Sequence, residues 1–207
     1  MKKHRTTYKF YLLFTLITIG PATWVAGKVG EIMSLAINSN NPLLAWGVVQ
    51  PPTVVLVLGI FFLIYERWIW KTPPFSWIHF PYLGGRYEGS VVSSYDNGEY
   101  PVVLEVRQSL LTTLVCLYTP RSASYSITAD VGTNENENES LAYIYRNTPR
   151  TVTDNLDMTS HYGMAVLEYF GDTSSLKGFY FNDPRDRGRH GTLECKRVSR
   201  QRKKRFE

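Results

Sequence analysis

The stretch LKGFYFNDPRDRGRHGTLECKRV, residues 176–198, contains two short alternating runs joined by a strongly polar turn. The runs 176–182 and 190–198 carry apolar or aromatic side chains at alternate positions, which is typical of half-buried β-strands. Pro and Gly between them supply turn geometry. The stretch therefore predicts a β-hairpin, and a solvated loop is the plain interpretation of its polar turn. That turn carries three arginines: Arg185, Arg187 and Arg189.

The same pattern recurs through the last two thirds of the chain. Short runs separated by Gly, Pro, Asn and Asp turns are typical of an antiparallel sandwich or barrel. We predict an all-β, antiparallel, eight-stranded small β-barrel, preceded by two transmembrane α-helices. The expected strands are 85–94, 101–108, 112–119, 122–131, 141–147, 162–170, 176–182 and 190–198.

Alternation also predicts which side chains face the barrel interior, because side chains two apart point the same way. In the first three strands these are Tyr87, Gly89, Val91, Val102, Leu104, Val106, Leu114, Cys116 and Tyr118. In later strands the same face becomes polar and aromatic: Leu141, Tyr143, Tyr145, Asn147, His161, Gly163, Ala165, Leu167, Gly178, Tyr180 and Asn182. Small barrels are either filled by side chains or hold one small ligand, and polar aromatic residues favour the ligand.

Strands that simply run up and down would place the turns after the first, third, fifth and seventh strands on one rim. That rim collects arginines, whose planar fork suits phosphate groups. Aromatic rings below it are suited to stacking on nucleobases. We therefore predict a pocket for a compact nucleotide. Its candidate ligand-binding residues are Arg121, Tyr145, Asn147, His161, Tyr180 and Arg187.

The first third of the chain has the composition of a membrane segment. Residues 8–26 are apolar and nearly uncharged and residues 43–65 are charge-free and mostly apolar, and each is long enough to cross a bilayer as a helix. A cleavable signal peptide is the alternative for the first run. The basic residues that precede the first apolar run predict a multi-pass protein with both termini in the cytoplasm. Pro51 and Pro52 are expected to bend or break the second helix.

Three segments follow from this division. Residues 1–80 hold the two predicted spans and a Pro-rich connector, 81–198 the cytosolic barrel, and 199–207 a basic tail. Of the net charge of +5, the last twelve residues carry +6. Such a tail either contacts anionic lipid or is a disordered, solubilising terminus. Cys116 and Cys195 lack any metal-ligand spacing, so burial is expected for both, with no metal and no cofactor.

Several motifs in order resemble a known family. After the two apolar runs come YLGGRYEGS, VVLEVRQSLLTTLVCLYTPRSAS, YIYRNTP, HYGMAVLEY and LKGFYFNDPRDRGRHGTLE. This order resembles the SMODS-associating two-transmembrane, β-strand-rich effectors of bacterial CBASS anti-phage systems. The resemblance implies an inner-membrane receptor that binds a cyclic dinucleotide or oligonucleotide made by a CD-NTase. It also implies self-association, disruption of the lipid bilayer and cell death.

Other functions remain open from the residues alone. One is a tethered, lipocalin-like carrier of an apolar ligand, lined by Val91, Leu104, Leu114 and Leu167. Another is a membrane-anchored scaffold for partner proteins. An enzyme is not expected, because the His–carboxylate pairs lack any accompanying catalytic motif. No binding to a DNA or RNA polymer is expected, since the basic charge belongs to the tail.

Overall fold

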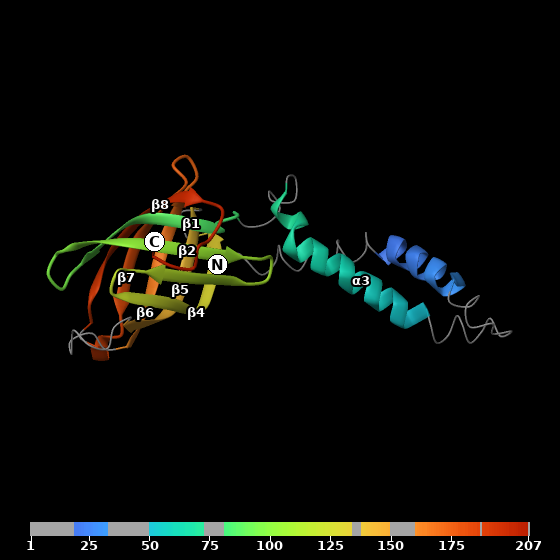
Figure 1. Ribbon diagram of the computed structural model, residues 1–207, viewed down its shortest axis with the longest axis horizontal. Coiled ribbons are helices and arrows are strands. Elements are labelled where there is room, and N and C mark those ends of the chain that lie inside the picture. The colour runs from blue at the N-terminus through green and yellow to red at the C-terminus, as the bar shows by residue number, and fades with distance from the viewer. Residues whose placement is uncertain are drawn as a thin grey trace. The chain divides into compact units, whose positions relative to one another are not determined.

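The computed structural model describes residues 19–32, 50–72, 81–133, 138–149, 160–186 and 188–206 (Figure 1). Within these ranges, the side chains of residues 50–54 and 186 are not described. The chain divides into two compact units, with the boundary between residues 75 and 76 of the sequence.

The N-terminal unit is helical where it is described. One helix covers residues 19–32, α3 runs Gln50–Arg67, and the 3-10 turn η2 runs Ile69–Lys71. No described helix combines the length and apolar character needed to cross a membrane. Parts of both predicted spans, residues 8–18 and 43–49, lie outside the described residues. Pro51 and Pro52, expected to bend or break the second helix, stand in the first described turn of α3, and the residues before Gln50 that would test this expectation lie outside the described residues.

The C-terminal unit is a closed barrel of eight antiparallel strands, as predicted (Figure 1). Every strand pairs with its neighbours in sequence, and β8 closes the sheet by pairing with β1. The strands are β1 (Gly85–Ser93), β2 (Glu99–Gln108), β3 (Thr113–Tyr118), β4 (Ser122–Thr133), β5 (Glu139–Pro149), β6 (His161–Phe170), β7 (Ser175–Asn182) and β8 (His190–Ser199). Closure leaves no strand edge, so the unit has a complete sheet of its own.

This order defines two ends of the barrel. The chain enters at residue 81, and we call this side the entry end; it also carries residues 109–112 and 171–174. The opposite side, the far mouth, is formed by residues 94–98, 119–121 and 183–189, with the β5–β6 connection. Residue 187 and most of that connection lie outside the described residues.

The barrel interior is filled at its centre by buried side chains. The central set comprises Val102, Leu104, Val106, Val115, Leu141, Tyr143, Ala165, Leu167, Leu193 and Cys195. Two interior positions must be glycine because the coiled strands approach closely: a Cβ at Gly89 would lie 1.9 Å from the Glu194 carbonyl oxygen, and one at Gly178 2.0 Å from that of Val166. The glycines at these two positions therefore allow the strands to approach each other as closely as a small barrel requires.

The prediction of which β3 side chains face the barrel interior is wrong. Val115 pairs with Val106 and Leu117 with Leu104, so these two side chains point inward. Leu114 is exposed instead, and Cys116 and Tyr118 lie on the outer wall. The error arises because residues 114–118 are all apolar or aromatic, so alternation carries no information there.

The basic tail is also not a free terminus. Residues 200–206, which we call the C-terminal strap, lie against the outer wall of β1 and β2. Phe206 packs against the outer cluster of Val103, Tyr118 and Ala123. These three side chains are buried although they point away from the barrel interior. The boundary predicted at residue 199 is the end of β8, but the residues after it belong to the same unit.

Candidate functional site

The entry end of the barrel is closed by hydrogen bonds between interior side chains and the entering chain. Tyr87 Oη donates to the Leu83 carbonyl at 2.8 Å, and the Leu83 N–H donates to Gln108 Oε1 at 2.7 Å. Arg197 Nη2 donates to the Tyr82 carbonyl at 2.9 Å, and its guanidinium lies 5.1 Å from the Tyr87 ring centroid. Leu83 and Tyr87 are fully buried. These bonds therefore tie the entering chain to interior side chains of β1, β2 and β8.

A layer of polar side chains lies inside the far mouth. Tyr145 Oη of β5 donates to Asn182 Oδ1 of β7 at 2.9 Å. Ser124 Oγ of β4 donates to Asn147 Oδ1 of β5 at 3.0 Å. All four residues are buried, at 5–7% exposure. Buried polar groups require partners, so this layer holds its side chains in defined orientations.

The layer leaves hydrogen-bond donors available. In both asparagines the amide oxygen accepts a bond, and within the described part of the chain neither Nδ2 group of Asn147 and Asn182 has a partner. Each carboxamide nitrogen carries two hydrogens. Two fixed amides with unused donors are therefore suited to the acceptor atoms of a base, a sugar or a phosphate.

Two glycines make room for the tyrosine rings at this level. A Cβ on Gly163 would lie 2.5 Å from Cζ and Oη of Tyr145, and one on Gly191 would lie 2.7 Å from Cε1 of Tyr180. Both glycines pair in register with the strands that carry these rings. Gly163 and Gly191 therefore leave the space that the rings of Tyr145 and Tyr180 occupy.

The rim of the far mouth combines guanidinium groups with aromatic rings. Arg189 lies 4.0 Å from the Tyr95 ring centroid, a close cation–π contact. Tyr100, which lies on the interior face of β2 by its pairing with Val91, donates to Asp96. This bond, with the Gly98 N–H and the charge of Arg189, lowers the pKa of Asp96. The positive charge of Arg121 acts on Tyr100, so both arginines lie near this aromatic group.

Two further arginines lie at the same rim but differ in their partners. Arg146 Nε donates to Ser160 Oγ at 3.2 Å, and its guanidinium is 6.0 Å from the Tyr162 ring centroid. Arg185 forms an ion pair with Asp183 at 2.7 Å, which lowers the pKa of Asp183 to about 2. The charge of Arg185 is thus locally neutralised, whereas Arg121, Arg146 and Arg189 contribute positive potential.

The buried tyrosines of the interior are neutral hydrogen-bonding groups. Burial raises the pKa of Tyr143 and Tyr145 well above the usual range, and raises that of Tyr87 to about 12. Their hydroxyls therefore remain protonated across the physiological pH range.

The strand register brings four of the predicted site residues together. Asn147 pairs with His161, Tyr145 with Gly163, and Tyr180 with Ala165, so their side chains share the interior face at the far mouth. Asn147 and Tyr145 are buried, whereas His161 and Tyr180 are half-buried. Arg121 stands exposed in the β3–β4 turn of the same rim, and Arg187 lies outside the described residues.

Some residues of the far mouth were not among the predicted site residues. Asn182 and Ser124 were omitted although their interior alternation could have indicated them. Tyr100 was missed because its strand begins two residues earlier than predicted. Arg189 was not chosen because a turn of three arginines gives no sign of which one stacks on Tyr95, a residue nearly a hundred positions away.

No metal-binding or reactive cysteine chemistry is evident in the described part of the chain. Groups of three or more His, Cys, Asp or Glu side chains with metal-binding geometry do not occur there. Burial raises the pKa of Cys195 to about 12, and Cys116 is shifted in the same direction. Both cysteines are free thiols. Thiols with raised pKa values are poor nucleophiles, which agrees with a structural role.

The described residues form a closed eight-stranded barrel with a polar, partly cationic layer at its far mouth, an arrangement suited to a small polar ligand. Comparison with known proteins specifies it further. Residues 78–197 match the family model described as Cap15, cyclic dinucleotide receptor domain, and the chain belongs to this family. It is also similar to CD-NTase-associated protein 15 of Yersinia aleksiciae, with 27% identity over 164 residues, 78% of this chain and 76% of that protein. The resemblance to CBASS effectors is confirmed.

Proposed function

We propose that this protein is a CBASS anti-phage effector whose barrel binds a cyclic di- or oligonucleotide at the far mouth. The family supports a cyclic dinucleotide as ligand. The position of the ligand is supported by two buried, oriented side-chain amides, those of Asn147 and Asn182, whose Nδ2 groups have no partner within the described residues. The rim arginines Arg121, Arg146 and Arg189 supply charge for the phosphates.

The geometry assigns different tasks to two levels of the site. The amides and Tyr145 can read the polar edges of a base, while half-buried Tyr180 and exposed Tyr100 offer ring faces for stacking. Phosphates carry the formal charge of the ligand and belong at the rim. A cyclic nucleotide bound in this way would enter the mouth base-first.

The proposal extends to the membrane. The apolar runs of the sequence support two inner-membrane spans, with the barrel in the cytoplasm, and the exposed apolar side chains of α3, among them Val55, Leu56 and Leu63, are compatible with an apolar environment. Ligand binding would drive oligomerisation of these segments and disrupt the bilayer. A ligand can bias assembly only through its differential affinity for the assembled state. A rim shared between neighbouring barrels would supply that difference.

An apolar-ligand carrier is less well supported. Leu104 and Leu167 do face inward, but they are fully buried among other core side chains, and Leu114 is exposed on the outside. The polar layer at the far mouth would also oppose entry of an apolar molecule at that end, because its donors would lose water without compensation.

Calorimetric titration of the full chain in detergent with a panel of cyclic di- and trinucleotides tests the binding function. We expect one member to bind at submicromolar concentration, and the Asn182→Ala variant to lose at least tenfold in affinity. The matched control is Asn138→Ala, an exposed asparagine at the entry end of the barrel. Absence of binding across the panel, or equal losses in both variants, would contradict the proposed site.

The membrane part requires a separate measurement. In cells that express the chain with its cognate CD-NTase, entry of a membrane-impermeant dye is expected only when the messenger is made. Dye entry without any messenger, or cell death with an intact dye barrier, would contradict ligand-driven membrane disruption while leaving ligand binding untouched.

A further inference from the structure

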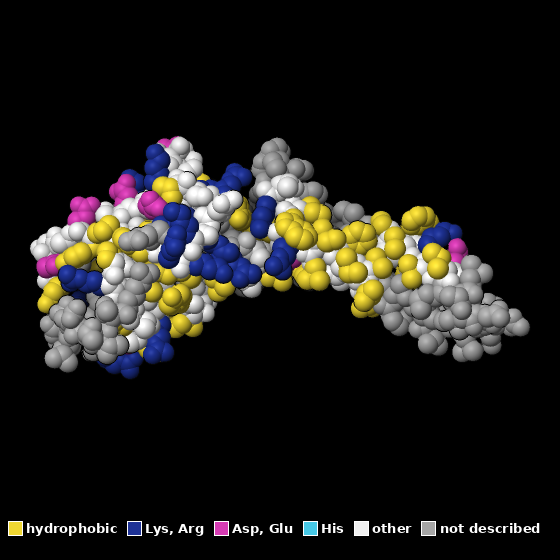
Figure 2. Space-filling model, in the orientation of Figure 1, with side chains coloured by type: hydrophobic (Ala, Val, Ile, Leu, Met, Phe, Trp, Pro, Cys, Tyr) yellow, Lys and Arg dark blue, Asp and Glu magenta, His cyan; other side chains and the backbone are white. Residues whose placement is uncertain are grey.

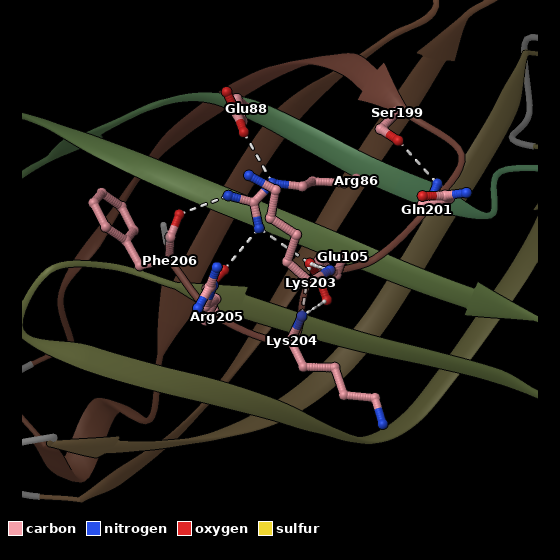
Figure 3. A network of polar contacts seen from close by, with 9 residues as sticks. All are labelled: Arg86, Glu88, Glu105, Ser199, Gln201, Lys203, Lys204, Arg205 and Phe206. Atoms are coloured by element: carbon pink, nitrogen blue, oxygen red, sulfur yellow. Dashed lines mark hydrogen bonds and ion pairs between the residues drawn. The ribbon is translucent and has the colours of Figure 1, made fainter.

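The C-terminal strap is a folded element whose backbone is fixed by one buried ion pair. Arg86 Nη1 lies 3.1 Å from Glu105 Oε1, and both side chains are only 3% exposed (Figure 3). Arg86 also donates to the carbonyls of Arg205 at 2.7 Å and Phe206 at 2.6 Å. The strap therefore uses its carbonyls to bind the cation of the pair.

The strap also binds the anion of this ion pair, the Glu105 carboxylate. The N–H groups of Lys203 and Lys204 donate to the Glu105 carboxylate at 2.8 and 3.0 Å. Lys204 has a positive φ of 61°, so two successive N–H groups point the same way and form a concave anion-binding nest. These carbonyls and N–H groups of the strap are turned toward the wall, and its basic side chains are exposed.

These exposed side chains form a basic surface. Five basic residues of the strap are exposed: Arg200, Arg202, Lys203, Lys204 and Arg205. Among the described residues of the adjoining wall, two acids are engaged, since Glu105 binds the strap backbone and Glu88 pairs with Arg86. Figure 2 shows Lys and Arg side chains gathered over β1 and β2, and Figure 3 shows the Lys204 side chain extending away from the ion pair.

We propose that the strap is a docking surface for the anionic headgroups of a phospholipid bilayer. This inference rests on the membrane part of the proposed function. The charge of the strap is complementary to an anionic leaflet, and the strap follows the end of β8 and runs along the outer wall of the barrel. Each basic residue near such a surface strengthens partitioning roughly fivefold, equivalent to about 1 kcal/mol. Phe206, which packs on the wall, keeps the strap from becoming a flexible tail.

The strap differs from the far mouth in the partner that it suits. At the far mouth, single arginines lie around fixed amides, an arrangement that fits one compact ligand. On the strap five basic residues are exposed within six positions of the sequence, on the outer wall of the barrel. An extended anionic surface is the partner that engages several of these groups together.

Vesicle sedimentation of the barrel unit, residues 76–207, tests the proposal. This unit has a closed sheet and its own core, and near-UV circular dichroism verifies that each variant is folded. We expect binding to phosphatidylcholine vesicles containing about one third phosphatidylglycerol, and little binding to phosphatidylcholine alone. The Arg202→Gln/Lys204→Asn variant should lose about 25-fold in partitioning. Asn is chosen at 204 because it tolerates a positive φ.

A matched control separates the strap from net charge. The Lys177→Gln/Arg185→Gln variant removes the same two charges from β7 and the far mouth, and we expect it to keep binding within about twofold of wild type. Equal losses in the two variants, or unchanged binding of the strap variant, would overturn the proposal. Displacement by inorganic phosphate at constant ionic strength would make the strap a site for a single phosphate group and would also overturn it.

The test is independent of the receptor function. A strap variant that loses vesicle binding but keeps its affinity for a cyclic dinucleotide supports the strap alone. Wild-type protein that binds vesicles but no cyclic nucleotide would contradict the proposed receptor and leave the strap standing.

Discussion

Tyr145 and Asn182 meet across the far mouth, where the phenol hydroxyl of β5 donates to the amide oxygen of β7 at 2.9 Å. The two residues are 37 positions apart in sequence and belong to strands that do not pair with each other, since β6 lies between them. The bond fixes the orientation of the Asn182 amide, so its Nδ2 group points to a defined place in the mouth. Several expectations follow from such contacts.

Removing the Tyr145 hydroxyl should lower both the stability of the barrel and its affinity for the ligand. In Tyr145→Phe the Asn182 oxygen loses its donor, which should lower the free energy of unfolding by about 1–2 kcal/mol. Freed rotation of the amide should reduce affinity for the cyclic dinucleotide roughly tenfold. Calorimetry and urea denaturation measure both effects. Tyr143→Phe makes the same change one interior position deeper and should leave affinity intact; a comparable loss in that variant would argue against an oriented amide.

The stacked guanidinium of Arg189 should contribute to ligand affinity without supporting the fold. Arg189→Gln is expected to weaken cyclic dinucleotide binding about tenfold or more, because a charge-assisted contact to phosphate is lost. The melting temperature should stay nearly constant, since the residue is in a rim turn. Arg185→Gln is the control, because Asp183 already neutralises Arg185. Loss of affinity in the control alone would show that the phosphate lies elsewhere on the rim.

Alanine substitution should destabilise the barrel at two glycines of the far mouth, but not at a third glycine in β4. An alanine at Gly163 would push against the Tyr145 ring, and one at Gly191 would lie 1.9 Å from the Val92 carbonyl oxygen. Destabilisation of about 1–3 kcal/mol is expected for Gly163→Ala and more for Gly191→Ala, since backbone must move. Gly132 in β4 has no atom within 4 Å of its Cβ position, so Gly132→Ala should fall within about 0.5 kcal/mol of wild type. Thermal denaturation of the three variants compares them directly.

Breaking the Arg86–Glu105 pair should release the strap. Glu105→Gln leaves buried Arg86 with only the half-exposed Glu88 as counter-charge, so the loss of stability should approach the cost of about 3–5 kcal/mol that is typical of a broken buried pair. Amide hydrogen exchange over residues 200–206 should accelerate at the same time, because the carboxylate that binds the Lys203 and Lys204 N–H groups is gone. In the Arg86→Met/Glu105→Leu double variant no buried charge remains, so its loss of stability should be smaller than that of Glu105→Gln. Equal losses would show that the pair contributes by packing alone.

Alkaline pH should unfold the barrel through its buried tyrosines. Burial raises the pKa of Tyr87 from 10.0 to about 12 and shifts Tyr143 and Tyr145 in the same direction. The unfolded chain releases these protons first, so stability is fully present below pH 10 and is lost as the pH rises toward 12. Tyrosinate absorbance followed together with circular dichroism measures this. Tyr143→Phe should make the loss less steep; ionisation of the buried tyrosines in a barrel that stays folded would contradict the expectation.

Much of the barrel could be predicted from local sequence because strand formation depends on local signals. Turn residues such as Asp183, Pro184 and Gly188 separate runs whose side chains alternate, and all eight strands lie within a few residues of their predicted limits. The alternation in β5, β6 and β7 also predicted a shared interior face for Tyr145, Asn147, His161 and Tyr180. These inferences needed no knowledge of which strands pair.

The sequence by itself thus determined the strands, the up-and-down order and the interior of the later strands, because period and turn chemistry are local properties. Only the tertiary structure decided the face of β3, where every residue is apolar and Val115 and Leu117 point inward because of their pairing with β2. It also decided that the basic tail is a strap, because its anchor is a pair of charges, Arg86 and Glu105, that closure of the sheet buries about a hundred residues earlier in the chain. Burial and pairing of distant residues are properties of the folded barrel, and no local pattern encodes them.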